Sequence, residues 1–357
     1  MWRASFDYKL MNKIRWGIIG PGSIAHNFAD GLKQSYSGEL VAIASLNDER
    51  RLSFGNKYNI NNELRFDNYD ALLNSNVVDA VYISTPHTLH AELSIKAAGK
   101  GKHILCEKPA AVNFSQGQKV INTVKEAGVF YKEGFMYRCH PQIPALLKLL
   151  KDKIVGDVKK INSSFGFDMK KIIPEHRLFN KNLAGGAILD VGLYPVSFSR
   201  MIAAVNLEKK FINPINLSAE ARIGETGVDE VASANMEFEN GVIAEAQTAI
   251  MKNMENNAII ECSEGKIIVD NPWMPGRDGG PYKSTIKIIK NDKEEVKEFK
   301  GPEHLFFFEA ELSSQSIIKE KNEVPHPGMT WEDTLGNLKV LDDWRNKINY
   351  SIKEDNL

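Results

Sequence analysis

A glycine-rich turn stands between an apolar strand pattern and an amphipathic helix pattern near the start of the chain. Residues 14–19 are mostly apolar, and residues 24–33 place apolar side chains four positions apart, which predicts a strand followed by a helix. Between them, Gly20, Gly22 and Ala25 form the pattern G-x-G-x-x-A. Gly20 permits a tight turn, Gly22 lets the backbone approach a pyrophosphate, and Ala25 lets the helix pack closely on the strand. This context favours a dinucleotide-binding βαβ unit over a purely structural turn.

The helix that follows the turn is expected to bind phosphate. The first N–H groups of such a helix and the positive end of its dipole face the ligand. The cofactor contacts expected from the turn are Gly20, Gly22, Ser23, Ile24 and Ala25.

The end of the second expected strand, at residues 40–45, bears on which cofactor binds. An Asp or Glu at this tip would bind the ribose 2′-hydroxyl and favour NAD. The chain instead has Ser45 there, followed by Asn47 and Arg50, whose side chains are suited to a 2′-phosphate. We therefore expect NADP. The alternative is NAD, with Arg50 as a solvated helix residue.

Strand and helix patterns continue to alternate, which predicts a doubly wound parallel sheet. Further strands are expected at residues 77–83, 103–106 and 129–133, and helices at residues 69–73, 89–100 and 114–127. Ligands of such sheets bind at the carboxyl ends of the strands. Besides the glycine turn, the residues expected at these ends are Ser45, Thr85, Pro86, His87, Glu107 and Lys108.

From residue 156 the pattern changes to consecutive hairpins, which predicts an open and largely antiparallel sheet. The clearest signal is Asn240-Gly241, a dipeptide that favours a hairpin turn. Strands are expected at residues 158–168, 231–238, 242–250, 258–263, 266–270, 285–290 and 294–299, and helices at residues 141–151, 305–319 and 331–346. A further helix is expected to begin after Gly185-Gly186 and to pack on this sheet.

The fold class expected from these patterns is α/β. The N-terminal part is a Rossmann domain, and the C-terminal part is an α+β domain with the antiparallel sheet. The expected organisation is an extension at 1–12, a dinucleotide-binding domain at 13–140, a substrate and oligomerisation domain at 141–330, and a C-terminal helix and tail at 331–357.

Several short stretches recur in an order typical of one enzyme family. They are GPGSIA at 20–25, YISTPHTLH at 82–90, CEKP at 106–109, GGAILDVGLYPV at 185–196 and MTWEDTLGNLKVLDDWR at 329–345. Together they span nearly the whole chain. The sequence thereby resembles the Gfo/Idh/MocA family, which includes glucose–fructose oxidoreductase and inositol dehydrogenase.

The resemblance implies roles for individual residues. In this family the lysine of the EKP motif, here Lys108, lies near the nicotinamide and the reacting hydroxyl. Many members use a histidine as acid/base where this chain has Tyr194. A tyrosine there resembles the branch that contains dimeric dihydrodiol dehydrogenase, glucose–fructose oxidoreductase and some aldose dehydrogenases, and His87 matches a histidine of the dihydrodiol dehydrogenase branch. The resemblance implies an NAD(P)-dependent oxidoreductase acting on a secondary alcohol or carbonyl of a sugar, cyclic polyol or trans-dihydrodiol.

Lys108 and Tyr194 are chemically suited to act as a pair. Free tyrosine titrates near about pH 10, and a neighbouring ammonium favours its ionised form. We therefore expect Lys108 to lower the pKa of Tyr194, which would exchange the proton while Lys108 polarises the oxygen. Asp190 would orient Lys108 or bind a substrate hydroxyl. The reverse assignment, with Lys108 as the direct proton donor, stays open.

Other polar residues are candidates for substrate binding: His87, Arg138, His140 and Asp190. Arg138 and His140 follow the last Rossmann strand, so their alternative role is to tie the two domains together. For His87 the alternative is a structural place near a helix start. No metal site is expected, because His87, His90 and His140 lack helical i, i+4 spacing and a carboxylate companion.

Two other kinds of function compete with a dehydrogenase. A non-catalytic, dinucleotide-binding regulator would keep the glycine turn but would not need Lys108 and Tyr194. An oxidoreductase with permanently bound NADP would keep all of these features and retain its cofactor on purification.

Composition narrows the partners to small molecules. The net charge of −1 provides no basic excess for nucleic acid. No apolar run approaches the length of about 20 residues that is needed to cross a membrane. The first residues lack a signal-peptide pattern. Three cysteines without CxxC spacing fit a reducing cytoplasm. The family resemblance implies a homo-oligomer, dimer or tetramer, built on the C-terminal sheet.

Overall fold

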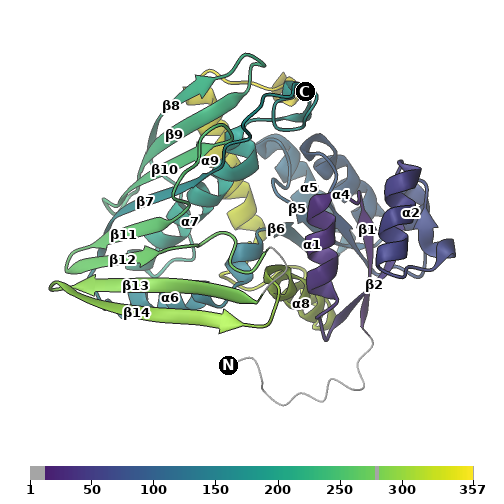
Figure 1. The fold of residues 1–357 in the computed structure, drawn as a ribbon, viewed down its shortest axis with the longest axis horizontal. Coiled ribbons are helices and arrows are strands. Elements are labelled where there is room, and N and C mark those ends of the chain that lie inside the picture. The colour runs from purple at the N-terminus through teal and green to yellow at the C-terminus, as the bar shows by residue number, and fades with distance from the viewer. Residues whose placement is uncertain (1–12, 278–280, 357) are drawn as a thin grey trace.

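The computed structural model describes residues 13–277 and 281–356. They form two parts, each built on one β-sheet, with helices packed between the sheets (Figure 1). The extension expected at residues 1–12 lies outside the described residues. The expected α/β architecture, with a Rossmann sheet and a largely antiparallel sheet, is confirmed.

The described N-terminal residues form a parallel sheet in the order β3-β2-β1-β4-β5-β6. Its strands are β1 (Ile14–Ile19), β2 (Gly38–Ala44), β3 (Arg65–Phe66), β4 (Ala80–Ile83), β5 (His103–Glu107) and β6 (Tyr131–Gly134). β4 is buried along its whole length, as expected for a central strand covered on both faces. The strand order reverses between β1 and β4, which is where doubly wound sheets bind ligands.

Helices cover both faces of this sheet, and one of them comes from far along the chain. The local helices are α1 (Ser23–Leu32), α2 (Asp48–Lys57), α3 (Tyr69–Leu73), α4 (His90–Gly99) and α5 (Phe114–Ala127). The distant helix is α8 (Leu305–Ile318), which packs on α1 (Figure 1). A Cβ added to Gly31 of α1 would lie 2.5 Å from the backbone of Phe306, so a glycine is needed for this close approach.

The division of the chain into domains at the expected boundaries stays a prediction.

The second sheet has the order β14-β13-β12-β11-β7-β10-β9-β8. Its strands are β7 (Val158–Gly166), β8 (Asn216–Ile223), β9 (Asp229–Glu237), β10 (Ile243–Ala249), β11 (Ala258–Cys262), β12 (Gly265–Val269), β13 (Tyr282–Lys290) and β14 (Lys293–Gly301). Among the described strands of this second sheet, β7 and β10 form the one parallel pair, and the other neighbouring strands are antiparallel.

The edge strand β8 is missing from the sequence-based expectation. Its residues alternate between polar side chains and small ones such as Ala219 and Ala221, so its apolar signal is weak. Pairing with β9 supplies the strand, with Ala219 opposite Ala234 and Ala221 opposite Ala232. Pairing with β9, rather than local propensity, therefore determines the strand conformation of β8.

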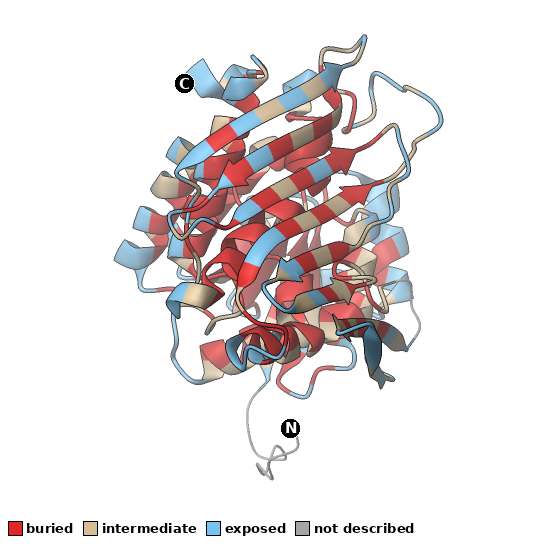
Figure 2. Ribbon diagram, turned by 90° about the vertical axis from the view of Figure 1, so that its left-hand side faces the viewer, coloured by how far each residue is buried: buried red, intermediate tan, exposed pale blue. Residues whose placement is uncertain are grey.

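Helices cover one face of the second sheet, and the strands alternate between buried and exposed residues (Figure 2). The covering helices are α6 (Gln142–Lys151), α7 (Leu193–Ala203) and α9 (Trp331–Lys347). A π-helical turn, Ile188–Gly192, leads into α7. The expected oligomer on the sheet's other face stays a prediction.

The helical run at residues 181–207 is long and apolar enough to span a membrane, with a mean hydropathy of 1.4 in its best window. That window is entirely buried inside the protein. Core helices of globular domains have the same properties, and α7 lies in the core here.

Candidate active site

The glycine turn forms an open cradle at the start of α1. Gly20 has a φ of +86°, a conformation that L side chains rarely adopt. A Cβ added to Gly22 would meet no described atom within 4 Å, so this backbone faces open space. Gly22 is the N-cap of α1, and the first turn begins with Ser23 and Ile24 and contains no acidic residue.

The start of α1 has no side-chain cap, a property that it shares with α4, α6 and α7 among the described helices. Side chains cap α2, α5, α8 and α9. Thr85, at the end of the neighbouring strand β4, has a buried Oγ1 without a partner in the described chain. Unbonded N–H groups and an unsatisfied hydroxyl beside an open glycine fit a dinucleotide phosphate.

At the tip of β2 the three residues expected at a 2′-phosphate lie close together but have different environments. Ser45 is buried, and its Oγ accepts a hydrogen bond from the backbone N–H of Asn47 at 3.2 Å. Asn47 caps α2, because its Oδ1 accepts from the backbone N–H of Arg50 at 2.8 Å. Arg51 folds back to donate to the carbonyl oxygen of Ser45 at 2.9 Å. Arg50 is the exposed cation at this tip.

Lys108, at the carboxyl end of β5, reaches across to the second part of the molecule. Its Nζ donates to the carbonyl oxygen of Asp190 at 2.5 Å and lies 3.2 Å from Oδ1 of the same residue. The ammonium also lies 5.5 Å from the centroid of the Tyr194 ring. The structure therefore brings together the three residues expected to be catalytic.

Asp190 lies on the π-helical turn and is 3% exposed. Its Oδ1 accepts from Nη1 of Arg177 at 2.8 Å as well as from Lys108. Burial alone would raise the pKa of Asp190, but Lys108 and Arg177 outweigh burial and hold the pKa well below its usual range. Asp190 thus carries a negative charge that orients two cations.

Sequence reasoning missed Arg177. The residue lies in the segment after β7 that carries no readable motif, and only its position in space links it to Asp190. A single arginine in such a segment gives no signal in one sequence.

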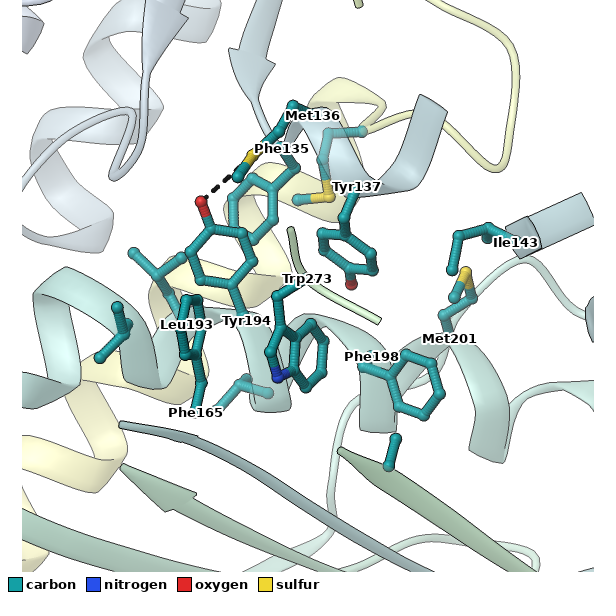
Figure 3. Packing of buried hydrophobic residues seen from close by; sticks show 14 of the residues in the cluster. Phe135, Met136, Tyr137, Ile143, Phe165, Leu193, Tyr194, Phe198, Met201 and Trp273 are labelled. Atoms are coloured by element: carbon teal, nitrogen blue, oxygen red, sulfur yellow. Dashed lines mark hydrogen bonds between the residues drawn. The ribbon is translucent and has the colours of Figure 1, made fainter. Parts of the chain in front are cut away.

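Tyr194 is enclosed by aromatic side chains, among them Phe135, Phe165 and Trp273 (Figure 3). Its hydroxyl donates to the sulfur of Met136 at 3.3 Å (Figure 3). Burial raises the pKa of Tyr194 well above its ordinary value, and nearby carboxylates act in the same direction. The expectation of a lowered pKa for Tyr194 is therefore wrong, because burial and the nearby carboxylates outweigh the positive charges around the ring.

The two histidines near the end of β4 have different environments. His87 is buried, with Nδ1 3.4 Å from the carbonyl oxygen of Ala184. Burial and the charge of Arg177 hold the pKa of His87 well below its ordinary value, so the ring is neutral. His90 lies between the carbonyl oxygens of Thr85 and Pro109, at 2.8 and 2.7 Å, and joins the two strand ends.

Glu107 and Pro86 lie at the strand ends where they were expected. The carboxylate of Glu107 accepts from the hydroxyl of Tyr82 and from the backbone N–H of Lys108. Burial raises the pKa of Glu107 to about 7. Both contacts of the carboxylate are within the protein, and the expected contact of Glu107 with the cofactor stays a prediction. Pro86 is exposed beside the buried His87.

The substrate-binding role expected for Arg138 is wrong. The side chain is fully buried, and its Nη2 donates to Oδ2 of Asp333 at 2.6 Å. Nη1 donates to Oγ of Ser197 at 2.9 Å, and Nε donates to the carbonyl oxygen of Pro327 at 2.5 Å. Arg138 therefore ties the 3-10 turn after β6, Met136–Cys139, to α7 and α9, which was the alternative role.

His140 is likewise a buried packing residue. Its ring stands edge-on to Tyr282 and Phe308, with centroids 4.6 and 5.3 Å apart. Burial lowers the pKa of His140 to about 3, so the ring is neutral. The expected substrate contact is therefore wrong for His140 as well.

Replacement of Arg138 by methionine should lower the free energy of unfolding by about 3 kcal/mol or more, because it breaks a buried ion pair. Asp333 keeps a second partner, since Nη1 of Arg200 donates to its Oδ1 at 2.6 Å. The measurement is urea unfolding followed by circular dichroism. As a control, Lys148→Met removes an exposed ion pair with Asp152 and should cost less than about 1 kcal/mol. Equal effects of the two variants would contradict the structural role of Arg138.

Within residues 13–277 and 281–356, no group of three or more His, Cys, Asp or Glu side chains is placed to hold a metal ion.

Comparison with known proteins places this geometry in a family. Residues 14–135 match the model described as "Oxidoreductase family, NAD-binding Rossmann fold", and residues 144–268 match the "GFO/IDH/MocA C-terminal domain". Trans-1,2-dihydrobenzene-1,2-diol dehydrogenase of Mus musculus is 32% identical over 73% of this chain and 76% of the relative. The chain belongs to the Gfo/Idh/MocA oxidoreductase family. The enzyme of the same name from Xenopus laevis is 30% identical over 87% of this chain and 91% of its own.

Solved structures of two other oxidoreductases share the fold. KijD10, a 3-ketoreductase from Actinomadura kijaniata in complex with NADP and TDP-benzene, is 26% identical with a TM-score of 0.80, covering 94% of this chain and 98% of its own. The aldose-aldose oxidoreductase from Caulobacter crescentus has a TM-score of 0.83 at 22% identity over 95% and 98% of the two chains, which shows the fold alone.

This Gfo/Idh/MocA protein is accordingly an enzyme, an oxidoreductase with an NAD(P)-binding Rossmann domain. The expectation of a non-catalytic regulator loses its support, because the relatives named above are dehydrogenases and reductases.

Proposed function

We propose that the protein transfers hydride between NADP and a secondary alcohol or carbonyl of a sugar, cyclic polyol or trans-dihydrodiol. One observation carries the proposal. Lys108, at the carboxyl end of a parallel strand, is held by Asp190 over the ring of Tyr194. These residues come from both parts of the molecule and meet where doubly wound sheets bind ligands. The relatives include dihydrodiol dehydrogenases and a sugar ketoreductase.

The proposed roles follow from the contacts. The bound cofactor would supply or accept the hydride, and the protein would supply orientation and a proton. The ammonium of Lys108 polarises the reacting oxygen, and Asp190 fixes the direction of that ammonium. The raised pKa of Tyr194 keeps its hydroxyl protonated, so it is suited to give a proton to a carbonyl oxygen during reduction. A thioether is a weak acceptor, so the bond of this hydroxyl to Met136 is readily exchanged for a substrate oxygen.

The reverse assignment, in which Lys108 donates the proton directly, makes a different prediction. It requires that a variant without the Tyr194 hydroxyl retain turnover. The Tyr194 variant described in the Discussion separates the two assignments.

NADP is the proposed cofactor, with NAD as the alternative. Support comes from the exposed Arg50 near the tip of β2 and from Ser45 at the strand end, the position where an Asp or Glu would favour NAD. Solved structures of KijD10 contain NADP. Retention of NADP through purification would favour the alternative of an oxidoreductase with permanently bound NADP.

Replacement of Arg50 by alanine should weaken NADP binding by about 10- to 100-fold, the range for a hydrogen bond to a charged group. NAD binding should be nearly unchanged, because NAD lacks the 2′-phosphate. Dissociation constants for both cofactors are measured by calorimetric titration. Lys100→Ala, at an exposed helix end, is the control and should alter neither constant. A preference of the wild type for NAD would overturn the NADP proposal.

A panel of aldoses, inositols and trans-dihydrodiols tests the substrate class. Turnover is followed by absorbance of the reduced nicotinamide, with NADP and then NAD as cofactor. Activity on none of these hydroxyl compounds, in a preparation that binds NADP, would overturn the proposed reaction. The proposed dimer or tetramer is measured by light scattering in solution.

A further inference from the structure

The candidate site carries an outward-facing arginine that the proposed reaction does not use. Arg177 lies between β7 and the π-helical turn, and 46% of its side chain is exposed. Lys108 and Asp190 beside it are more enclosed, with 13% and 4% of their side chains exposed. Arg177 is therefore the cation of this group that an incoming substrate meets first.

Most hydrogen-bonding capacity of Arg177 is unengaged. Nη1 donates to Oδ1 of Asp190 at 2.8 Å, and no further partner of this guanidinium is found in the described ranges of the chain. A guanidinium has five N–H donors in a planar fork. Lys108 shares the same carboxylate oxygen at 3.2 Å, so the unengaged donors of Arg177 lie beside the ammonium proposed to hold the reacting oxygen.

Positive charge exceeds negative charge on the accessible side of this group. Asp190 supplies one negative charge against the two cations Lys108 and Arg177. His87 is neutral, because burial and Arg177 hold its pKa well below the ordinary value. Glu107 is turned into the core, where Tyr82 and the Lys108 backbone bind its carboxylate, and its charge also acts on Arg177. Burial raises the pKa of Glu107 to about 7, so near neutral pH it only partly offsets the second cation. A neutral substrate would leave the exposed guanidinium of Arg177 without an anionic partner other than Asp190, whereas an anion would supply one.

We infer that the substrate carries an oxyanion, a carboxylate or a phosphate, which Arg177 binds while Lys108 holds the reacting oxygen. The planar fork of arginine matches carboxylate and phosphate oxygens in two parallel hydrogen bonds. Asp190 holds the guanidinium in place before the substrate arrives. The inference rests on the proposed function and narrows its substrates to acidic sugars or polyols, such as sugar acids or sugar phosphates.

Matched substrates test the charge requirement. Each scaffold is offered in neutral and anionic form with NADP: glucose with glucuronate and glucose 6-phosphate, and inositol with inositol 1-phosphate. We expect kcat/KM for one anionic form to exceed that for its neutral parent by about tenfold or more. Preference for glucuronate or for the phosphates shows which oxyanion the site takes. Added salt should raise KM for the anion and leave KM for the neutral parent unchanged, because salt screens exposed charges.

The variant Arg177→Gln tests the residue while keeping its approximate length. KM for the preferred anion should rise by about 10- to 100-fold, with kcat and the NADP dissociation constant near wild type. Arg177→Lys should restore part of the loss, because it keeps the charge without the planar fork. Lys171 is an exposed cation on the same segment, so Lys171→Gln is the matched control. It should change none of the three quantities, KM, kcat and the NADP dissociation constant.

Two outcomes overturn the inference and are distinguishable from failure of the proposed function. Equal or better kcat/KM for the neutral parent removes the charge requirement while leaving the reaction intact. An equal loss by Arg177→Gln on neutral and anionic substrates shows that Arg177 only supports the segment. Absence of turnover on this set and on the panel of aldoses, inositols and trans-dihydrodiols, with NADP bound, overturns the proposed reaction itself.

Discussion

Replacement of Lys108 by methionine should lower kcat by at least about 100- to 1,000-fold, the range for removal of one preorganised electrostatic group. The ammonium lies between Asp190 and the ring of Tyr194, where the reacting oxygen is proposed to bind. The NADP dissociation constant should stay near wild type, since the glycine turn that holds the phosphates is untouched. Steady-state absorbance at the reduced-nicotinamide band and cofactor titration measure the two quantities.

The fold should survive this change. Asp190 keeps its ion pair with Arg177 at 2.8 Å, so its buried carboxylate is not left alone. Circular dichroism and the unfolding midpoint check this point. Lys100→Met, at the exposed end of α4, is the matched control and should behave as wild type. Wild-type turnover in the Lys108 variant would remove this residue from the mechanism.

Replacement of Tyr194 by phenylalanine should lower the rate of reduction by about 100- to 10,000-fold, the range for loss of a general acid. The change deletes one oxygen whose bond in the structure is to the Met136 thioether, a weak acceptor. Stability should therefore change little, and the aromatic packing around Phe165 and Trp273 should remain. Near-wild-type turnover would support the reverse assignment, with Lys108 as the direct proton donor.

The pH dependence gives a second test of Tyr194. Because burial raises its pKa well above the ordinary value, the hydroxyl is protonated throughout the neutral range. Reduction, which uses the protonated form, should be flat in pH there, whereas oxidation, which needs the deprotonated form, should rise as pH rises. The rise should disappear in Tyr194→Phe. Oxidation that falls as pH rises would contradict this role, and so would an identical profile in the variant.

Much of the N-terminal architecture could be predicted from the sequence because its signals are local. Apolar runs mark strands buried on both faces, and Gly20 and Gly22 mark a turn that other residues adopt poorly. Parallel connections place successive strand ends at one edge of the sheet, so Thr85 and Lys108 could be assigned there. Strand β8 escaped prediction because its pairing with β9 comes from a neighbour in space.

The errors at the site have one physical cause. Arg138 and His140 follow a strand end, but position along the chain does not say whether a side chain points toward the ligand or into the core. The side chain of Arg138 binds Asp333, which lies far along the chain, and no local sequence pattern predicts that pairing. The sequence does not show the raised pKa of Tyr194 either, because the burial that raises it comes from aromatic rings of other segments.

The sequence by itself determined the glycine turn, the parallel sheet and the membership of Lys108 and Tyr194 in one family pattern, since each depends on local backbone preference or on a short motif. Tertiary structure alone decided that Asp190 carries a charge between two cations, that Tyr194 stays protonated, and that Arg177 lies exposed beside Asp190. These properties depend on desolvation and on charges a few ångströms away, and only folding sets such distances.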